Sequence, residues 1–207
     1  MSIHQIYAPF LKYFRTRRMQ QFEAMFRLVP ATRIIDVGGY QFNWTLIDAA
    51  PQVLLVNLED EDRDDGRFRK VRGDGRQLPY DDNSFDIAYS NSVIEHVGDT
   101  DDQDAFATEI RRVAPRYYVQ TPNRWFVIEP HLIAAGIHWL PHRWMRRLVR
   151  WVSVWGWVVK PDQARVDAQL ASIRLLDRKQ MQRLFPDAEI HVETFLGMTK
   201  SLIAIRR

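Results

Sequence analysis

The 207-residue chain contains no cysteine, so neither disulfide bonds nor thiolate metal sites can contribute to its fold. No apolar run approaches the roughly 20 residues that a transmembrane helix needs, and the longest, residues 151–159, is about half that length. The N-terminal segment carries its basic residues after its apolar ones, which is the reverse of a secretory signal. These absences predict a cytoplasmic protein.

Acidic residues are missing from one part of the chain and concentrated in another. Residues 59–65 are mostly acidic, whereas residues 130–161 contain neither Asp nor Glu. The formal net charge is only +3, which does not indicate a general nucleic-acid-binding surface. We therefore do not expect a nucleic-acid partner.

Short β-like runs alternate with helical stretches along most of the chain. Strands are expected at residues 33–37, 53–58, 69–71, 85–90 and 116–120, followed by a hairpin of residues 189–195 and 200–207. Helices are expected at residues 4–28, 42–50, 101–113 and 177–185, the last capped by Asp177. Strands that alternate with helices predict a parallel sheet, with ligands bound at the carboxyl ends of the strands.

Residues 123–170 separate the fifth strand from the closing helix and hairpin, and they hold six of the seven tryptophans. We expect a single domain over residues 1–207, with an N-terminal helical segment at 1–30 and a helical Trp/Arg-rich insertion at 123–170. Within residues 139–160, tryptophan and leucine recur at helical spacing beside a face of arginines. We favour a lid packed on the sheet; the alternative is an interfacial helix on anionic lipid.

Residues 33–44, "RIIDVGGYQFNW", place Asp36 at the end of the first strand and Gly38 and Gly39 in the following turn. Glycine lacks a Cβ atom and tolerates positive φ, so the backbone of this turn can approach a ligand closely. The chain therefore has the start of a nucleotide-binding turn, but bulky residues from Tyr40 onward replace the usual further glycines.

Three later segments have polar side chains at predicted strand ends. About 20 residues after the turn, Asn57 or Glu59 can bind ribose hydroxyls. Asp74 can accept a hydrogen bond from an exocyclic amine, and the backbone at Gly75 and Arg76 can serve a ring nitrogen. The end of the fourth strand carries Ser90, Asn91 and Ser92, with Glu95 and His96 just beyond.

The order "DVGG", "NLE", "GDGRQLPYDDNSFDIAYSNSVIEHV" and "YYVQTPNRW" resembles the class I S-adenosylmethionine-dependent methyltransferases of the type 11 group. The resemblance implies a Rossmann-like α/β fold with a mostly parallel seven-stranded sheet and a C-terminal antiparallel hairpin. It implies S-adenosylmethionine as cofactor. The motif that lines the methionine part of the cofactor is matched by Asp36, Gly38 and Gly39. The ribose-binding position is matched by Asn57 and Glu59, and the adenine-binding position by Asp74. The strand end that lies under the donor methyl group is matched by Ser90 to Ser92.

The first motif departs from the family pattern, because D-x-G-x-G-x-G would place glycines where this chain has Tyr40 and Phe42. The same stretch also fails the dinucleotide pattern G-x-G-x-x-G at its second and third glycines. A pyrophosphate needs bare backbone there, whereas the carboxylate and sulfonium of S-adenosylmethionine can be held by fewer amides. Tyr40, Phe42 or Trp44 would then cover the cofactor, which favours the methyl donor over NAD.

The catalytic candidates are His96, a base for a hydroxyl acceptor, and its neighbour Glu95; a structural role for His96 is an equal alternative. The loop after the fifth strand offers Asn123, Arg124, Glu129 and His131 as substrate-binding residues. His131, His138 and His142 with Glu129 make a weak ligand set, so we expect no metal there.

The sequence thus predicts an S-adenosylmethionine-dependent methyltransferase (EC 2.1.1 class) that acts on a small-molecule, sugar or lipid-linked acceptor. The alternative is a non-catalytic cofactor-binding or membrane-surface interaction protein on the same fold, with peripheral membrane contact through residues 139–160. Oxygen, nitrogen and carbon acceptors and the oligomeric state stay open at this point.

Overall fold

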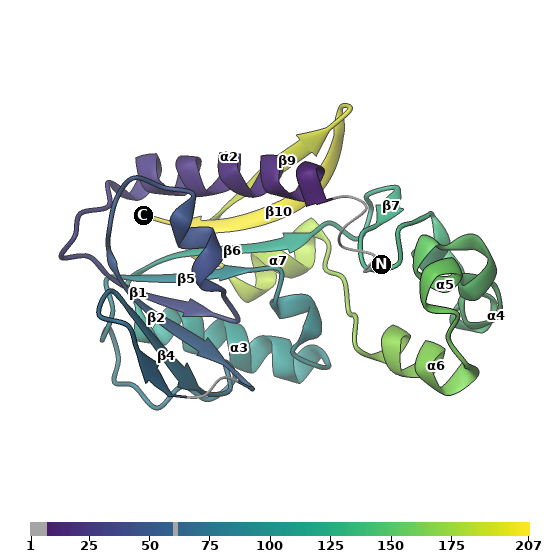
Figure 1. Ribbon diagram of the computed structural model, residues 1–207, viewed down its shortest axis with the longest axis horizontal. Helices are drawn as coiled ribbons and strands as arrows, with labels where there is room; N and C mark the ends of the chain where they lie inside the picture. The colour runs from purple at the N-terminus through teal and green to yellow at the C-terminus, as the bar shows by residue number, and fades with distance from the viewer. Residues whose placement is uncertain (1–7, 60–61) are drawn as a thin grey trace.

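The computed structural model describes residues 8–59 and 62–207, and its central element is an eight-stranded sheet (Figure 1). The strand order is β3-β4-β2-β1-β5-β6-β10-β9. The strands are β1 Arg33–Val37, β2 Gln52–Asn57, β3 Arg63–Asp64, β4 Phe68–Arg72, β5 Ile87–Asn91, β6 Arg116–Pro122, β9 Glu189–Phe195 and β10 Met198–Arg206. β1, β2, β4, β5 and β6 run parallel, and β9 and β10 form an antiparallel hairpin.

This architecture confirms the predicted mostly parallel α/β sheet with its C-terminal hairpin. The two-residue strand β3, which pairs antiparallel with β4, adds an edge strand to the seven that were expected. Strands β1, β2, β5 and β6 were predictable because each contains an apolar run bounded by polar or turn residues, as buried parallel strands usually do.

Six α-helices and three 3₁₀ turns are present in the described residues. The helices are α2 Ala8–Phe26, α3 Thr100–Val113, α4 His142–Val152, α5 Val154–Val159, α6 Gln163–Ala171 and α7 Arg178–Leu184. The 3₁₀ turns are η1 Gln41–Thr45, η2 Ile94–His96 and η3 Ile137–Trp139. Asp177 caps α7 through the Gln180 amide, as predicted, and the first residues of the helix expected at 4–28 lie outside the described residues.

The helix predicted at residues 42–50 is wrong, because the chain forms only the short turn η1 there. The side chain of Trp44 explains the difference. It is fully buried, and its indole N–H donates to the Asp36 carboxyl group at 2.8 Å. This contact draws the chain down onto the sheet immediately after β1, and a regular helix from residue 42 would not keep it.

The two faces of the sheet carry separate apolar cores. On one face, α2 contributes Met19, Phe22 and Phe26, which pack with Trp44 and the strand side chains. On the other face, α3 and α7 cover the sheet and enclose a larger core that includes Phe106 and Phe185. The parallel strands are therefore buried on both sides, and their carboxyl ends remain available for a site.

The insertion projects from one end of the sheet, as α4, α5 and α6 show in Figure 1. It begins with a small hairpin, β7 Ile128–Glu129 and β8 Ala134–Ala135, and its helices pack on that hairpin and on one another. They enclose a third apolar cluster of Leu132, Ala134, Ile137, Val149, Trp155 and Val166. This cluster is separate from the two cores on the sheet. Over the described ranges 8–59 and 62–207, no helix combines the length and the apolar character needed to cross a bilayer.

Candidate functional site

The order in which strands are added to the sheet reverses at β1, which pairs with β2 on one side and with β5 on the other. Open α/β sheets bind ligands at such a point, outside the carboxyl ends of the strands. A cavity of about 370 Å³ lies there, and we call it the switch-point cavity. Predicted residues that line it are Gly38, Tyr40, Asn57, Glu59, Asp74, Gly75, Ser92 and His96. Four segments that are far apart in the sequence thus meet around one space.

The other predicted cofactor-binding residues lie behind the wall of this cavity. Asp36 is fully buried, and a Cβ atom on Gly39 would come within 1.8 Å of its carboxyl oxygen. Ser90 is also fully buried, and its hydroxyl donates to the Val37 carbonyl at 2.9 Å. Asn91 accepts a hydrogen bond from Arg18, and both residues line a different cavity. These residues fix the shape of the wall, while their neighbours line it.

Gly38 is required by the turn itself. Its φ is +76°, in the left-handed region, and a Cβ atom there would come within 2.4 Å of the Val93 side chain. Its amide donates to the Val56 carbonyl of β2 at 2.7 Å, which continues the parallel ladder into the turn. The glycine therefore lets β1 and the segment after β5 approach each other at the floor of the cavity.

The polar groups of the switch-point cavity are held by short contacts. Asp74 accepts from the Arg76 amide at 2.9 Å and from its guanidinium, which lowers the pKa of the Asp74 carboxyl. Asn57 donates to the Gly39 carbonyl at 2.9 Å. Glu59 is exposed at the opening. The cavity thus offers two separate carboxylates, Asp74 and Glu59. One could accept hydrogen bonds from ribose hydroxyls and the other from an exocyclic amine.

A second cavity of about 290 Å³ lies on the other side of Ser92, and we call it the apolar cavity. Its walls are mostly apolar side chains from α2, the insertion and β9: Phe14, Phe126, Ile128, Pro130, Ile133 and Phe195. Ser92 lines both cavities. The backbone amide and the hydroxyl of Ser92 both donate to Gln120, each at 2.9 Å, so the residue is fixed at the boundary between the two spaces.

A buried ion pair lies beside the apolar cavity. Arg18 is 5% exposed; its Nη2 donates to both carboxyl oxygens of Glu193, at 2.9 and 3.1 Å, and its Nη1 donates to Gln120 at 3.1 Å. Sequence reasoning did not identify this role, because Arg18 belongs to an N-terminal helix and Glu193 to the last hairpin. No local pattern links residues so far apart.

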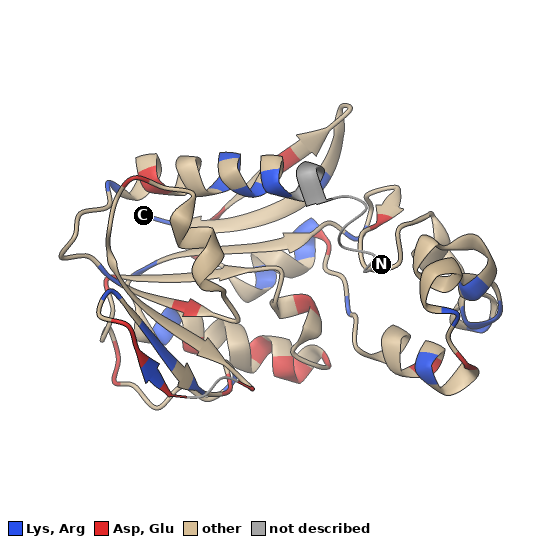
Figure 2. Ribbon diagram, viewed as in Figure 1, with Lys and Arg blue, Asp and Glu red and all other residues tan. Residues whose placement is uncertain are grey.

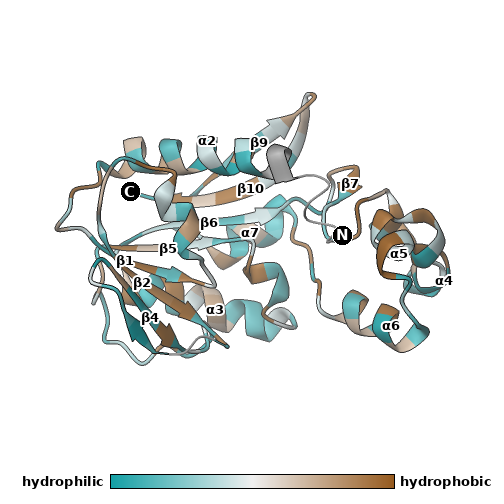
Figure 3. Cartoon of the chain, viewed as in Figure 1, coloured by the Kyte–Doolittle hydropathy of each residue, from teal (hydrophilic) through white to brown (hydrophobic). Residues whose placement is uncertain are grey.

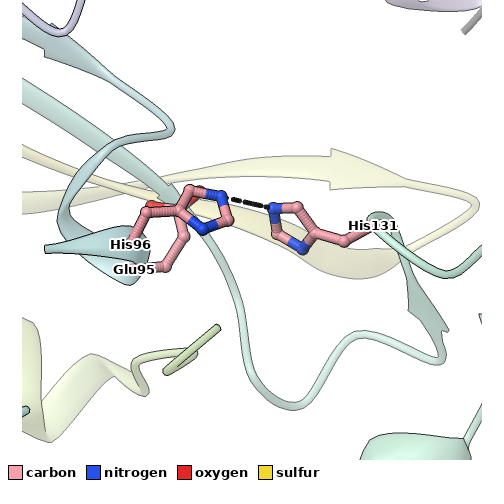
Figure 4. A group of neighbouring side chains, drawn as sticks. All are labelled: Glu95, His96 and His131. Carbon is pink, nitrogen blue, oxygen red and sulfur yellow. Dashed lines mark hydrogen bonds and ion pairs between the residues drawn. The ribbon is translucent and has the colours of Figure 1, made fainter. Parts of the chain in front are cut away.

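Glu95, His96 and His131 come together at the rim of the switch-point cavity (Figure 4). The Nε2 atoms of the two histidines lie 3.0 Å apart. Burial raises the pKa of Glu95, and the neighbouring histidines oppose that rise. Burial disfavours the charged form of His131, but its hydrogen bond to Glu129 and the nearby carboxyl groups outweigh burial and raise its pKa.

The predicted substrate-binding residues separate in the structure. Asn123 is buried and donates to the Thr199 carbonyl at 2.9 Å, which joins the start of the insertion to the hairpin. Arg124 and Glu129 line a third cavity of about 400 Å³ together with His138 and His142. His131 instead contacts His96, 35 positions earlier in the sequence, so the histidines of the insertion do not gather in one place.

Comparisons with known proteins agree with this geometry. The family described as a methyltransferase domain matches residues 32–116. A chain in the complex that contains the Haloferax volcanii Trm112 methyltransferase activator is similar at 13% identity, with a TM-score of 0.56, over 94% of this chain and 89% of that chain. A SAM-dependent methyltransferase from Methanosarcina mazei is similar at 14% identity, with a TM-score of 0.52, over 86% of this chain and 92% of that chain.

A third similar structure is that of Haemonchus contortus phosphoethanolamine N-methyltransferase 2 with phosphomonomethylethanolamine and S-adenosylhomocysteine. The identity is 14% and the TM-score 0.54, and the match covers 87% of this chain and 39% of that chain. No curated protein matches this chain in sequence. At such identities the structures share the fold, and the family match adds the methyltransferase domain.

The buried Asp36 carboxyl makes a prediction about the pH dependence of folding. Burial raises its pKa from 3.8 to about 7, and the hydrogen bond from Trp44 opposes that rise. Between about pH 4 and pH 7 the folded chain keeps a proton that the unfolded chain has lost, so this contribution to the free energy of unfolding falls as the pH rises. The full shift corresponds to roughly 4 kcal/mol at most. Asp36→Asn should remove this contribution.

Urea unfolding of both proteins at pH 5 and pH 7.5 would measure the effect. We expect the parent to lose more stability than Asp36→Asn between the two pH values. Equal losses in the two proteins would show that Asp36 is ionised, or exposed, in the folded chain.

Proposed function

We propose that this chain, a class I S-adenosylmethionine-dependent methyltransferase, binds its cofactor in the switch-point cavity and methylates an acceptor held in the apolar cavity. The observation that carries the proposal is Ser92, which lines both cavities. A sulfonium methyl group placed near Ser92 would face the second space directly. Methyl transfer is an in-line displacement, so the main task of the protein is to align donor and acceptor and to exclude water.

In this proposal each part of the cofactor has a matching group. The ribose hydroxyls would bind Glu59, with Asn57 beside it at the end of β2, and the adenine amine would bind Asp74. The methionine part would lie against the backbone at Gly38, next to the turn that Asp36 and Gly39 support from behind. Tyr40, which is 68% exposed and lines the cavity, could close over the bound cofactor.

The apolar cavity favours an acceptor with an apolar body. Its polar boundary includes Ser92, Gln120 and Lys200, which can orient one polar end of such a molecule near the donor. We infer that the acceptor is a small amphipathic or lipid-linked molecule. Arg124 and Glu129, on the neighbouring third cavity, would bind a more polar extension of it.

His96 is the proposed base for a hydroxyl acceptor, with Glu95 beneath it. Both ring nitrogens of His96 have partners, since Nδ1 contacts the Ser172 carbonyl at 2.9 Å and Nε2 contacts His131 at 3.0 Å. Nε2 would therefore accept a proton only after His131 moves aside. An acceptor that is already a good nucleophile would need no base.

A second function, attachment to a membrane surface, is favoured by the exposed tryptophans of the insertion. Trp144 and Trp151 of α4 and Trp157 of α5 are 47%, 68% and 61% exposed. Arg143 and Arg147 lie on the same short helix; Figure 2 shows basic residues on α4, and Figure 3 shows hydrophobic and hydrophilic residues side by side along α4 and α5. Tryptophan beside arginine suits the boundary of an anionic bilayer, where a lipid-linked acceptor would be found.

Cofactor binding is tested by calorimetry with S-adenosylhomocysteine. Glu59→Ala and Asp74→Ala should each weaken binding by roughly 10-fold to 100-fold, because each removes a charged hydrogen-bond acceptor. Glu189→Ala, which removes an exposed carboxylate on β9, is the control and should bind like the parent. No binding by the parent at millimolar ligand would contradict the proposal, and unchanged affinity in both cavity variants would contradict the assigned positions.

The acceptor cavity is tested by filling it. Ile128 lines the apolar cavity from the edge strand β7, and Ile128→Trp should occupy the space without touching the cofactor. With methyl-tritiated cofactor and a deproteinised cell extract, the parent should label organic-soluble small molecules. The labelling rate of the variant should be at least about tenfold lower. S-adenosylhomocysteine should bind both proteins equally.

Val192→Trp, on the exposed side of β9, is the control for the added indole. A parent that binds S-adenosylhomocysteine but labels no extract fraction would favour the non-catalytic alternative. Equal labelling by Ile128→Trp and the parent would mean that the acceptor binds elsewhere.

Membrane attachment is tested by sedimentation with phosphatidylserine-containing vesicles at low salt. The parent should bind, and Arg143→Glu/Arg147→Glu should lose most of that binding, because each arginine near an anionic surface contributes about 1 kcal/mol. Arg178→Glu/Lys179→Glu makes the same charge change on α7 and should bind like the parent. Arg146 is unsuitable for this test because it pairs with Asp167. Absence of parent binding would end this second function.

A further inference from the structure

The contact of Glu95, His96 and His131 has the composition of a metal-ligand set. One ligand atom from each residue lies within 4.8 Å of the other two. The two Nε2 atoms lie 3.0 Å apart, and Glu95 Oε1 lies 3.9 Å from His131 Nε2. Figure 4 shows the two rings with these nitrogens facing each other. The set joins η2 to the turn between β7 and β8, so only the tertiary fold assembles it.

The other ring nitrogens determine where the protons lie. Nδ1 of His96 is 2.9 Å from the Ser172 carbonyl, which can only accept, so this nitrogen carries a proton. Nδ1 of His131 is 2.6 Å from a carboxylate oxygen of Glu129 and donates to it. In neutral rings, both Nε2 atoms are then unprotonated. Two lone pairs would then face each other at 3.0 Å, so either a proton or a metal ion must lie between them.

Glu95 provides the second, independent observation. It is 0% exposed, and one of its carboxyl oxygens accepts from the Thr121 hydroxyl at 2.9 Å. The other oxygen, Oε1, is buried without a hydrogen-bond partner and faces His131. A buried carboxyl oxygen without a partner is costly. A proton shared by the two histidines would leave this oxygen unpaired, whereas a metal ion reached by all three residues would satisfy it.

We propose that Glu95, His96 and His131 bind a divalent transition-metal ion of the zinc class. Two ligands of a tetrahedral zinc ion, each about 2.1 Å from it, lie about 3.4 Å apart. The separations of 3.0 and 3.9 Å lie on either side of that value. Two imidazoles with one carboxylate favour Zn²⁺ and its neighbours over Mg²⁺ or Ca²⁺, which prefer oxygen ligands.

The surroundings also fit such an ion. Metal-bound histidines usually donate their second N–H to a carboxylate or a backbone carbonyl, and Glu129 and Ser172 supply these two acceptors. His96 lines the switch-point cavity and is exposed, so the remaining coordination positions would open toward the donor. An acceptor hydroxyl bound to the ion would lose its proton at a lower pH, and His96, whose Nε2 would hold the ion, would then not act as the base. This catalytic role rests on the proposed function, but metal binding itself does not.

The test is zinc binding by the full chain, without an affinity tag, after treatment with a chelator. Calorimetry with Zn²⁺ alone should show one ion per chain. His131→Ala and His96→Gln should each weaken binding by about 100-fold or more, because each removes one of three protein ligands. Glu95→Gln keeps the Thr121 contact but loses the charge, and should also weaken binding.

His142→Ala and His191→Ala are the matched controls, because they remove histidines outside the set, and they should bind zinc like the parent. His96 is exposed, so His96→Gln tests the site even if the variants at Glu95 or His131 fail to fold. A parent that does not bind zinc below about 0.1 mM, or a His96→Gln variant that binds like the parent, would overturn the proposal. Binding of S-adenosylhomocysteine in the same preparations separates this failure from failure of the proposed function.

Discussion

The carboxyl group of Asp36 lies at the centre of the turn on which the switch-point cavity depends. It is buried at the end of β1, holds the Trp44 indole through one oxygen, and leaves no room for any side chain on Gly39. The chain after β1 is thereby drawn across the sheet toward α2 and cannot continue as a regular helix. The backbone at Gly38 and the side chain of Tyr40 then face the cavity, while Trp44 joins the core on the opposite face.

This arrangement explains how the turn forms without the later glycines of the motif that it resembles. Glycines in that motif allow the backbone to approach a ligand, but here Trp44 anchors the turn from the other side of the sheet. The three aromatic residues proposed as alternatives for covering the cofactor have different positions. Tyr40 lines the switch-point cavity, Phe42 is half-exposed, and Trp44 is fully buried. The expectation that Trp44 covers the cofactor is therefore wrong, because its indole N–H is used by Asp36.

The insertion meets this frame through polar contacts and through the apolar side chains around the apolar cavity. Its helices enclose their own cluster. Asn123 contacts the C-terminal hairpin, and His131 contacts His96. Glu129 contacts the backbone of the insertion itself. The cluster formed by Glu95, His96 and His131 thus lies where two differently packed parts of the chain meet. A change in that cluster would alter both the rim of the switch-point cavity and the position of the β7–β8 hairpin beside the apolar cavity.

The sequence by itself determined the sheet and the position of the switch-point cavity. Apolar runs with a period typical of buried strands, the Asp177 cap and the glycine turn after β1 are local signals, and local signals survive folding because they depend on neighbours in the chain. Only the tertiary structure decided the partners of Arg18, His96 and His131. The Arg18–Glu193 pair joins residues 175 positions apart and the His96–His131 contact joins residues 35 positions apart, and such long-range side-chain pairing leaves no periodic trace in a single sequence. The same reason explains why the sequence left Trp44 as an alternative to Tyr40 and Phe42 for covering the cofactor, whereas the fold buries Trp44 in the core.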